Sequence, residues 1–155
     1  MVNPENRPVR IKQPGPLSIV YEQHWHAELV HFPVSFFVGS ALFMVLHLLS
    51  SSNRDAYELA SFVMLVSGAV VTLPATLTGW LSWRKYYRGA RTKLFLYKIR
   101  TAFAMVLLSI TLVVWHVIWP PPRDTAWLYA YAVGIFLLFL GTVIEGYYGG
   151  RLNHH

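Results

Sequence analysis

The chain alternates between long apolar blocks and short polar segments. Four blocks contain no charged residue and hold 20 residues or more, at 29–52, 59–83, 101–122 and 125–144. A helix needs about 20 apolar residues to cross a hydrocarbon core of about 30 Å, and it satisfies its own backbone hydrogen bonds there. The pattern therefore predicts an all-α integral membrane four-helix bundle, with helices at about 29–52, 58–83, 98–119 and 125–148.

The connections predict how these helices are paired. Turn-forming residues at 50–53 end the first helix, and three consecutive prolines at 120–122 end the third. Proline cannot continue a helix, and short links favour antiparallel neighbours. We therefore expect helices 1 and 2 to pair, and helices 3 and 4 to pair. Two parts are predicted: a polar N-terminal segment, 1–28, and a four-helix membrane domain, 29–155.

Composition agrees with a membrane protein and narrows the chemistry. Of the 155 residues, 55% are hydrophobic and only 13% are charged, about half the usual share of a soluble domain. The absence of cysteine excludes disulfides, thiol catalysis, cysteine-ligated iron–sulfur clusters and covalent c-type haem attachment. The sequence has no phosphate loop, dinucleotide fingerprint or catalytic-triad motif, so no enzyme activity is predicted.

Positive charge is distributed unevenly between the predicted sides. Eleven of the thirteen lysines and arginines lie before helix 1, between helices 2 and 3, or in the tail. The positive-inside rule then places both termini and the central loop in the cytoplasm. Because this loop adjoins two spans, we expect its cations to contact anionic lipid headgroups rather than nucleic acid. The candidates are Arg84, Lys85, Arg88, Arg91 and Lys93.

Two histidines lie near the predicted outer ends of helices 1 and 3. His47 and His116 should therefore sit at similar depth. Two imidazoles from different helices at one depth can ligate a b-type haem within a bundle. The alternative is that each histidine caps a helix or bonds a carbonyl at the interface.

A second polar cluster lies at the start of helix 1. His24, Glu28 and His31 fall at i, i+4 and i+7, so a helix would place them on one face. Glu28 and His31 have the spacing of half a di-metal motif, but the chain lacks a second half. Pro33 biases Phe32 away from helix, so we expect the register to break there. A metal site, a pH-responsive or quinone-proximal patch, and ordinary interfacial solvation all remain open.

Glu145 lies at the predicted cytoplasmic end of helix 4, at about the depth of His31. A buried carboxylate beside a histidine would suit proton transfer to a quinone. A snorkelling or salt-bridged helix-end residue is the alternative.

Three short motifs connect the chain with a known family. They are Val30-His31-Phe32-Pro33, the segment 79–83 with Gly79 and Trp83, and the segment 149–152 followed by His154. With them the chain resembles the domain-of-unknown-function family 2231, four-span predicted membrane proteins, over about 27–155. The resemblance implies a four-helix membrane domain in a bacterial inner membrane. By analogy with redox proteins that recur beside this family, it implies an electron-transfer or anchoring role, and a second haem if His31 and His154 pair.

Three functions follow as hypotheses. The first is a structural subunit that anchors within a respiratory or other redox membrane complex. The second is a subunit that binds haem b through His47 and His116 and passes electrons between a quinone and a partner. The third, a proton or small-solute transporter using His31 and Glu145, is less favoured because few charges lie at mid-membrane depth.

Overall fold

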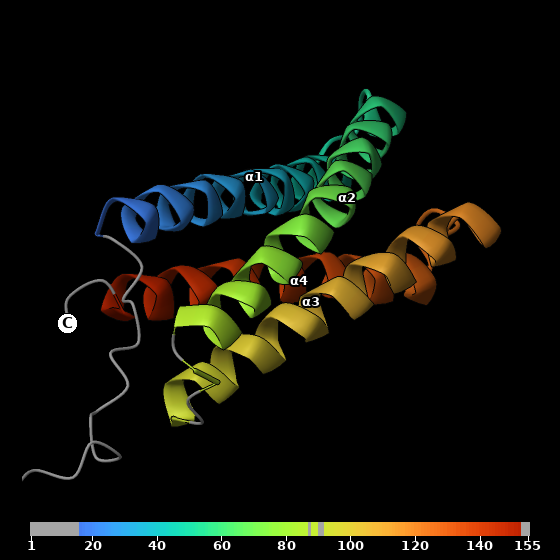
Figure 1. Cartoon of the computed structure of the whole chain (residues 1–155). Helices are drawn as coiled ribbons and strands as arrows, with labels where there is room; N and C mark the ends of the chain where they lie inside the picture. The colour runs from blue at the N-terminus through green and yellow to red at the C-terminus, as the bar shows by residue number, and fades with distance from the viewer. Residues whose placement is uncertain (1–15, 87, 90–91, 153–155) are drawn as a thin grey trace, which may run out of the picture.

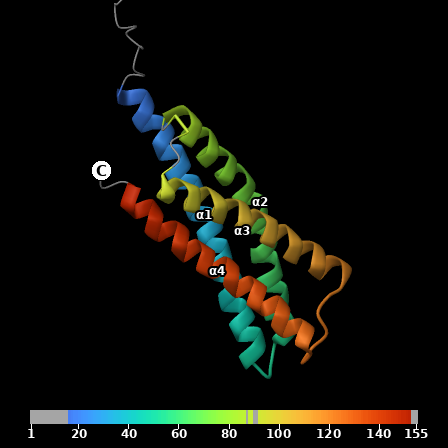
Figure 2. The ribbon, with the colours of Figure 1, turned by 90° about the horizontal axis from the view of Figure 1, so that it is seen from below.

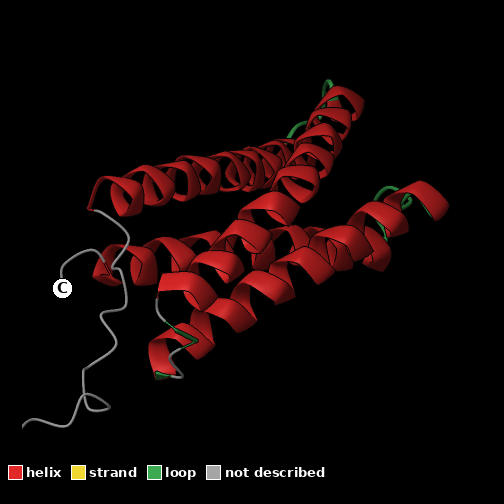
Figure 3. Cartoon of the chain, viewed as in Figure 1, coloured by secondary structure: helices red, strands yellow, loops and turns green. Residues whose placement is uncertain are grey.

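Helices and the short loops that join them make up the described part of the chain. The computed structural model describes residues 16–86, 88–89 and 92–152 (Figures 1 and 3). The four helices are α1 (Pro16–Leu49), α2 (Arg54–Tyr86), α3 (Lys93–Ile118) and α4 (Ala126–Leu152). The prediction of an all-α bundle is confirmed.

Each helix contains a span long and apolar enough to cross a membrane. The spans are Leu29–Leu49, Arg54–Lys85, Phe95–Ile118 and Ala126–Tyr148. They overlap the four charge-free blocks, and large apolar side chains such as Leu107 and Val117 are exposed on the outside of the bundle. Lipid solvates such side chains, so the molecule is a membrane protein with four spanning helices.

Helix α1 differs from the predicted helix in two respects. It begins at Pro16, well before residue 29, and it continues without interruption through Pro33. The expected break at Pro33 is therefore wrong. Proline removes only one backbone donor, and membrane helices tolerate this when neighbouring helices pack against the site. Pro33 is buried, and Pro74 also lies inside a helix, α2, where its side chain is exposed.

The helices form two antiparallel hairpins, as the short links predict. The α3–α4 hairpin packs beside the α1–α2 hairpin, with α4 against α1 and α3 against α2 (Figures 1 and 2). Helices α1 and α3 each contact α2 and α4, so α1 and α3 occupy opposite corners. The loops 50–53 and 119–125 lie at one end, called here the hairpin end. The start of α1, the α2–α3 connection and the end of α4 lie at the other, called the terminal end.

Small residues bring the helices close together. A methyl group added to Gly68 of α2 would lie 2.6 Å from the ring of Phe37 in α1. One added to Gly134 of α4 would lie 2.7 Å from Leu112 in α3. Such contacts leave little free space, because Phe37 and Leu112 are themselves buried in the core.

Two serines join α1 and α2 inside this core. The Ser40 hydroxyl donates to the carbonyl oxygen of Ser61 at 2.9 Å, and the Ser61 hydroxyl donates to that of Ser40 at 2.9 Å. Both side chains are buried. Their hydroxyl groups therefore find partners inside the apolar region, as burial of a polar group requires.

Candidate functional site: a polar cluster at the hairpin end

His47 is fully buried near the end of α1 and forms a reciprocal pair of hydrogen bonds with Arg54. Its Nδ1 lies 2.9 Å from the carbonyl oxygen of Arg54, and Arg54 Nε donates to the carbonyl oxygen of His47 at 3.2 Å. A carbonyl can only accept, so Nδ1 carries the hydrogen and a neutral ring has its lone pair on Nε2. These bonds hold the ring in place across the 50–53 loop.

Arg54 also connects the two hairpins. Its Nη2 lies 3.1 Å from Oδ1 of Asp124, in the loop before α4. A second ion pair joins Arg123 of the same loop to Asp55 of α2. The two arginines that the sequence places on this side therefore join the α3–α4 loop to the start of α2.

His116 lies on α3 at the same end, between an aromatic ring of α2 and one of α4. Its ring stacks on Phe62 with a centroid distance of 4.0 Å, and its centroid lies 5.4 Å from that of Tyr131. Trp115 packs edge-on against Tyr131 and Trp127. His47 and His116 therefore both lie near the hairpin end, on helices at opposite corners of the bundle. That the two imidazoles share a haem stays a prediction.

Three buried polar atoms in this cluster lack a hydrogen-bond partner among the residues that the structure describes. They are Nε2 of His47, Nδ1 of His116 and the hydroxyl oxygen of Tyr131. Glu58 of α2 lies close enough to act electrostatically on both His116 and Tyr131. Buried polar atoms without a partner are costly, and they call for an explanation such as a bound group or ordered water. Within the described ranges, no three His, Asp or Glu side chains come together as a metal site.

The terminal end holds the other predicted candidates. Glu145 is half-buried on α4, and Lys98 of α3 is the charged residue that acts on it. One of its carboxylate oxygens, Oε1, is buried without a partner in the described part of the chain. The His31 side chain is exposed on α1.

The structure describes only some of the remaining site residues that the sequence predicts. The backbone of α1 is helical at 24, 28 and 31, as the i, i+4 and i+7 spacing requires, but the side chains of His24 and Glu28 lie outside what the structure describes. Arg91 and His154 also lie outside it. The other headgroup candidates are exposed, as expected for contact with lipid: Arg84, Lys85, Arg88 and Lys93.

Three members of the hairpin-end cluster were not predicted from the sequence. Arg54 is the first charge after the apolar block that contains His47. Glu58 closes the charged segment before the second block, and Tyr131 lies inside the fourth block among apolar residues. A polar residue within one helical turn of a charge-free block is the feature that could have indicated Arg54 and Glu58.

The geometry defines a four-span helical membrane protein with a buried polar cluster at one end. The family model described as predicted membrane protein (DUF2231) matches residues 23–155, so the chain belongs to this family. Neither a curated protein nor a solved structure matches the chain significantly.

Proposed function

We propose that the protein is a structural subunit that anchors within a larger respiratory or other redox complex of a bacterial inner membrane. The observation that supports this function is the contrast between the inside and the outside of the bundle. Side chains such as Phe37, Met44 and Leu138 are buried against one another along its centre. Every helix meanwhile exposes large apolar side chains outward.

This contrast favours a function that works through the outer surface. Helices in a membrane associate through close packing and interhelical hydrogen bonds rather than through a hydrophobic driving force. A bundle whose centre is packed with side chains can offer its outer helix faces to partner helices. A transporter, by comparison, needs a water-accessible path lined by polar groups.

Steric variants on two outer faces test this function. Leu42 of α1 and Leu107 of α3 are both exposed and lie on helices at opposite corners. We expect the wild-type chain, extracted in mild detergent, to copurify at fixed stoichiometry with a subunit that carries a visible redox cofactor. One of the variants Leu42→Trp and Leu107→Trp should release that subunit, and the other should serve as its matched control. A chain that runs alone in every mild detergent would disprove the proposal.

A second candidate function is electron transfer by haem b, and the state of the two histidines favours it. Histidines that ligate iron commonly donate their other ring N–H to a carbonyl, which fixes the ring and leaves one nitrogen free. His47 has this arrangement, with Nδ1 on the Arg54 carbonyl and Nε2 buried without a described partner. His116 likewise keeps Nδ1 buried without one. Both histidines would hold the haem iron, the haem would supply one-electron transfer, and a quinone would be the electron donor or acceptor.

An absorption spectrum decides between the two candidates. We would record the purified chain oxidised and then reduced with dithionite. A Soret band with a sharp reduced alpha band, lost in His47→Asn and in His116→Phe, would support haem ligation by these residues. A featureless spectrum of the folded chain, purified from cells supplied with haem precursor, would exclude electron transfer by haem and would favour the structural function.

A further inference from the structure

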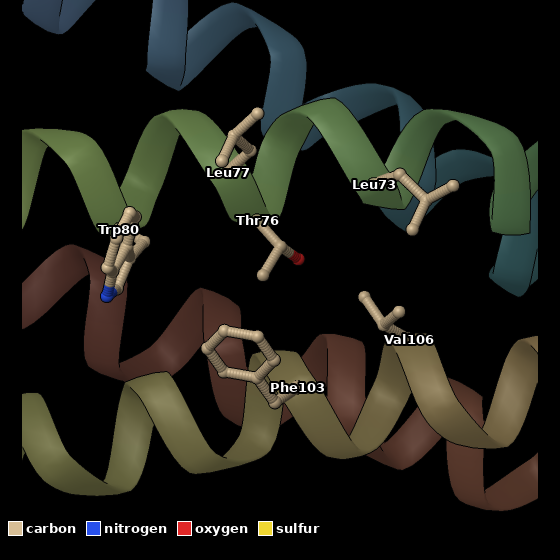
Figure 4. A pocket seen from close by; sticks show the side chains of 6 residues that line it. All are labelled: Leu73, Thr76, Leu77, Trp80, Phe103 and Val106. Carbon is tan, nitrogen blue, oxygen red and sulfur yellow. The ribbon is translucent and has the colours of Figure 1, made fainter.

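The membrane-facing side of α2 and α3 contains an apolar groove near the terminal end. Its volume is about 130 Å³. Figure 4 shows Thr76 and Trp80 of α2 and Phe103 and Val106 of α3 extending toward the space between the two helices, with the Thr76 oxygen turned into it. Leu73, Leu77 and Phe103 are exposed, so the groove opens on the outer face of the bundle. The lining residues are Leu73, Thr76, Leu77, Trp80, Phe103 and Val106.

Cations follow the groove residues on both helices, toward the terminal end of the bundle. The guanidinium carbon of Arg84 lies 5.0 Å from the centroid of the Trp80 ring, one helical turn below the groove. On α3, Lys93 and Arg100 line a neighbouring hollow of about 220 Å³, and Arg100 precedes Phe103 by one turn. The sequence from 84 to 100 contains seven lysines and arginines and no acidic residue.

We propose that this groove binds one anionic phospholipid, with an acyl chain between α2 and α3 and its phosphate at Arg84 and Arg100. The apolar lining matches a hydrocarbon chain, and the cations lie at the end where a headgroup would sit. Arginine binds phosphate through two parallel hydrogen bonds, and the Trp80 ring holds the Arg84 guanidinium by a cation–π contact. The proposal goes beyond the anchoring function, since a lipid that spans two helices would bind whether or not a partner subunit is present.

The chemistry of the site also distinguishes it from general lipid solvation. Lipids around a membrane protein exchange freely when only their chains make contact. A phosphate near fixed cations adds an electrostatic attraction that a zwitterionic headgroup, which carries its own ammonium, partly cancels. The site should therefore prefer phosphatidylglycerol to phosphatidylcholine with the same acyl chains.

Native mass spectrometry of the intact chain, with equal amounts of these two lipids, tests the proposal. We expect the wild type to retain one phosphatidylglycerol at activation energies that remove phosphatidylcholine. Arg84→Gln and Arg100→Gln should each weaken retention about fivefold. Thr76→Phe, which fills the groove, should abolish it. Arg123→Gln removes one charge at the hairpin end and is the matched control, so it should leave retention unchanged.

Three results would overturn the proposal. Equal retention of the two lipids would mean that the groove selects no anionic headgroup. Unchanged retention in Thr76→Phe would place the lipid on the basic surface without the groove. If Arg123→Gln weakens retention as much as Arg84→Gln does, the preference for phosphatidylglycerol depends on the net charge of the protein and not on this site. Because Arg84 is exposed, its glutamine variant should fold even if Thr76→Phe does not.

Discussion

Arg54, the first residue of α2, pairs with Asp124 in the loop before α4, although 70 residues separate them. The same side chain donates to the carbonyl oxygen of His47 at the end of α1. One guanidinium group therefore connects α1, α2 and the α3–α4 loop at the hairpin end. Arginine suits this position because its planar group presents several donors in fixed directions.

The first prediction concerns the two roles of Arg54. Asp124→Asn removes only the ion pair, whose carboxylate is 68% exposed, and should lower the free energy of unfolding by less than about 1 kcal/mol. Arg54→Gln also removes the bond to His47 and should cost about 1–2 kcal/mol more. Unfolding in detergent, followed by circular dichroism, measures both. Equal losses would mean that the bond to the His47 carbonyl contributes little.

The second prediction concerns the glycines at helix contacts. Gly68→Ala would place a methyl group 2.6 Å from the ring of Phe37, which is fully buried and cannot move aside. Overpacking of this kind costs about 1–3 kcal/mol. Gly141→Ala should cost less, because the atom it meets at 2.9 Å is the sulfur of Met105, a flexible side chain.

Gly146 is the matched control for these variants. It lies on α4, and a methyl group there would meet no atom within 4 Å among the described residues. Gly146→Ala should therefore be neutral or slightly stabilising, because alanine favours helix. The melting temperatures should fall in the order Gly146→Ala, Gly141→Ala, Gly68→Ala, and the reverse order would contradict the packing described here.

The sequence predicted the helices well because a single charge-free block that spans a bilayer can satisfy its own backbone hydrogen bonds only as a helix. It also predicted their pairing, because the 50–53 and 119–125 connections are short. The start of α1 was missed because polar residues before 29 carry no apolar pattern, and a helix there is set by backbone propensity and context. The break expected at Pro33 did not occur because tertiary packing outweighs the loss of one backbone bond.

The candidate site was predicted only in part, for a different reason. The depth of His47 and His116 follows from their position along two spans, so their location at one end could be inferred. Their partners could not, because the rotation of each helix about its axis depends on packing with its neighbours. The stacking of His116 on Phe62 and the bond from His47 to Arg54 both depend on that rotation.

The third prediction concerns the two serines that join α1 and α2. Each hydroxyl donates to the backbone of the other residue, and the two oxygens lie 3.3 Å apart. Hydrogen bonds between membrane helices contribute about 0.6 kcal/mol on average. Ser40→Ala and Ser61→Ala should each cost about this amount, and the double variant should cost less than their sum, because the hydroxyls share one environment. Strict additivity would mean that the two bonds act independently.

The last prediction separates the structural role of His47 from a ligand role. The side-chain amide of asparagine can replace the Nδ1–H donor toward the Arg54 carbonyl, but it has no atom at the position of Nε2. His47→Asn should therefore unfold close to the wild type, whereas His47→Ala leaves a cavity and should cost about 2–4 kcal/mol. His116→Phe is the matching variant on α3, since a phenyl ring keeps the stacking on Phe62 and removes both nitrogens. If the wild type carries haem, both conservative variants should lose its bands while keeping their stability, because only the nitrogens are gone. If His47→Asn unfolds as readily as His47→Ala, the bond to the Arg54 carbonyl is not what His47 contributes, and the buried Nε2 becomes the atom whose partner must be found.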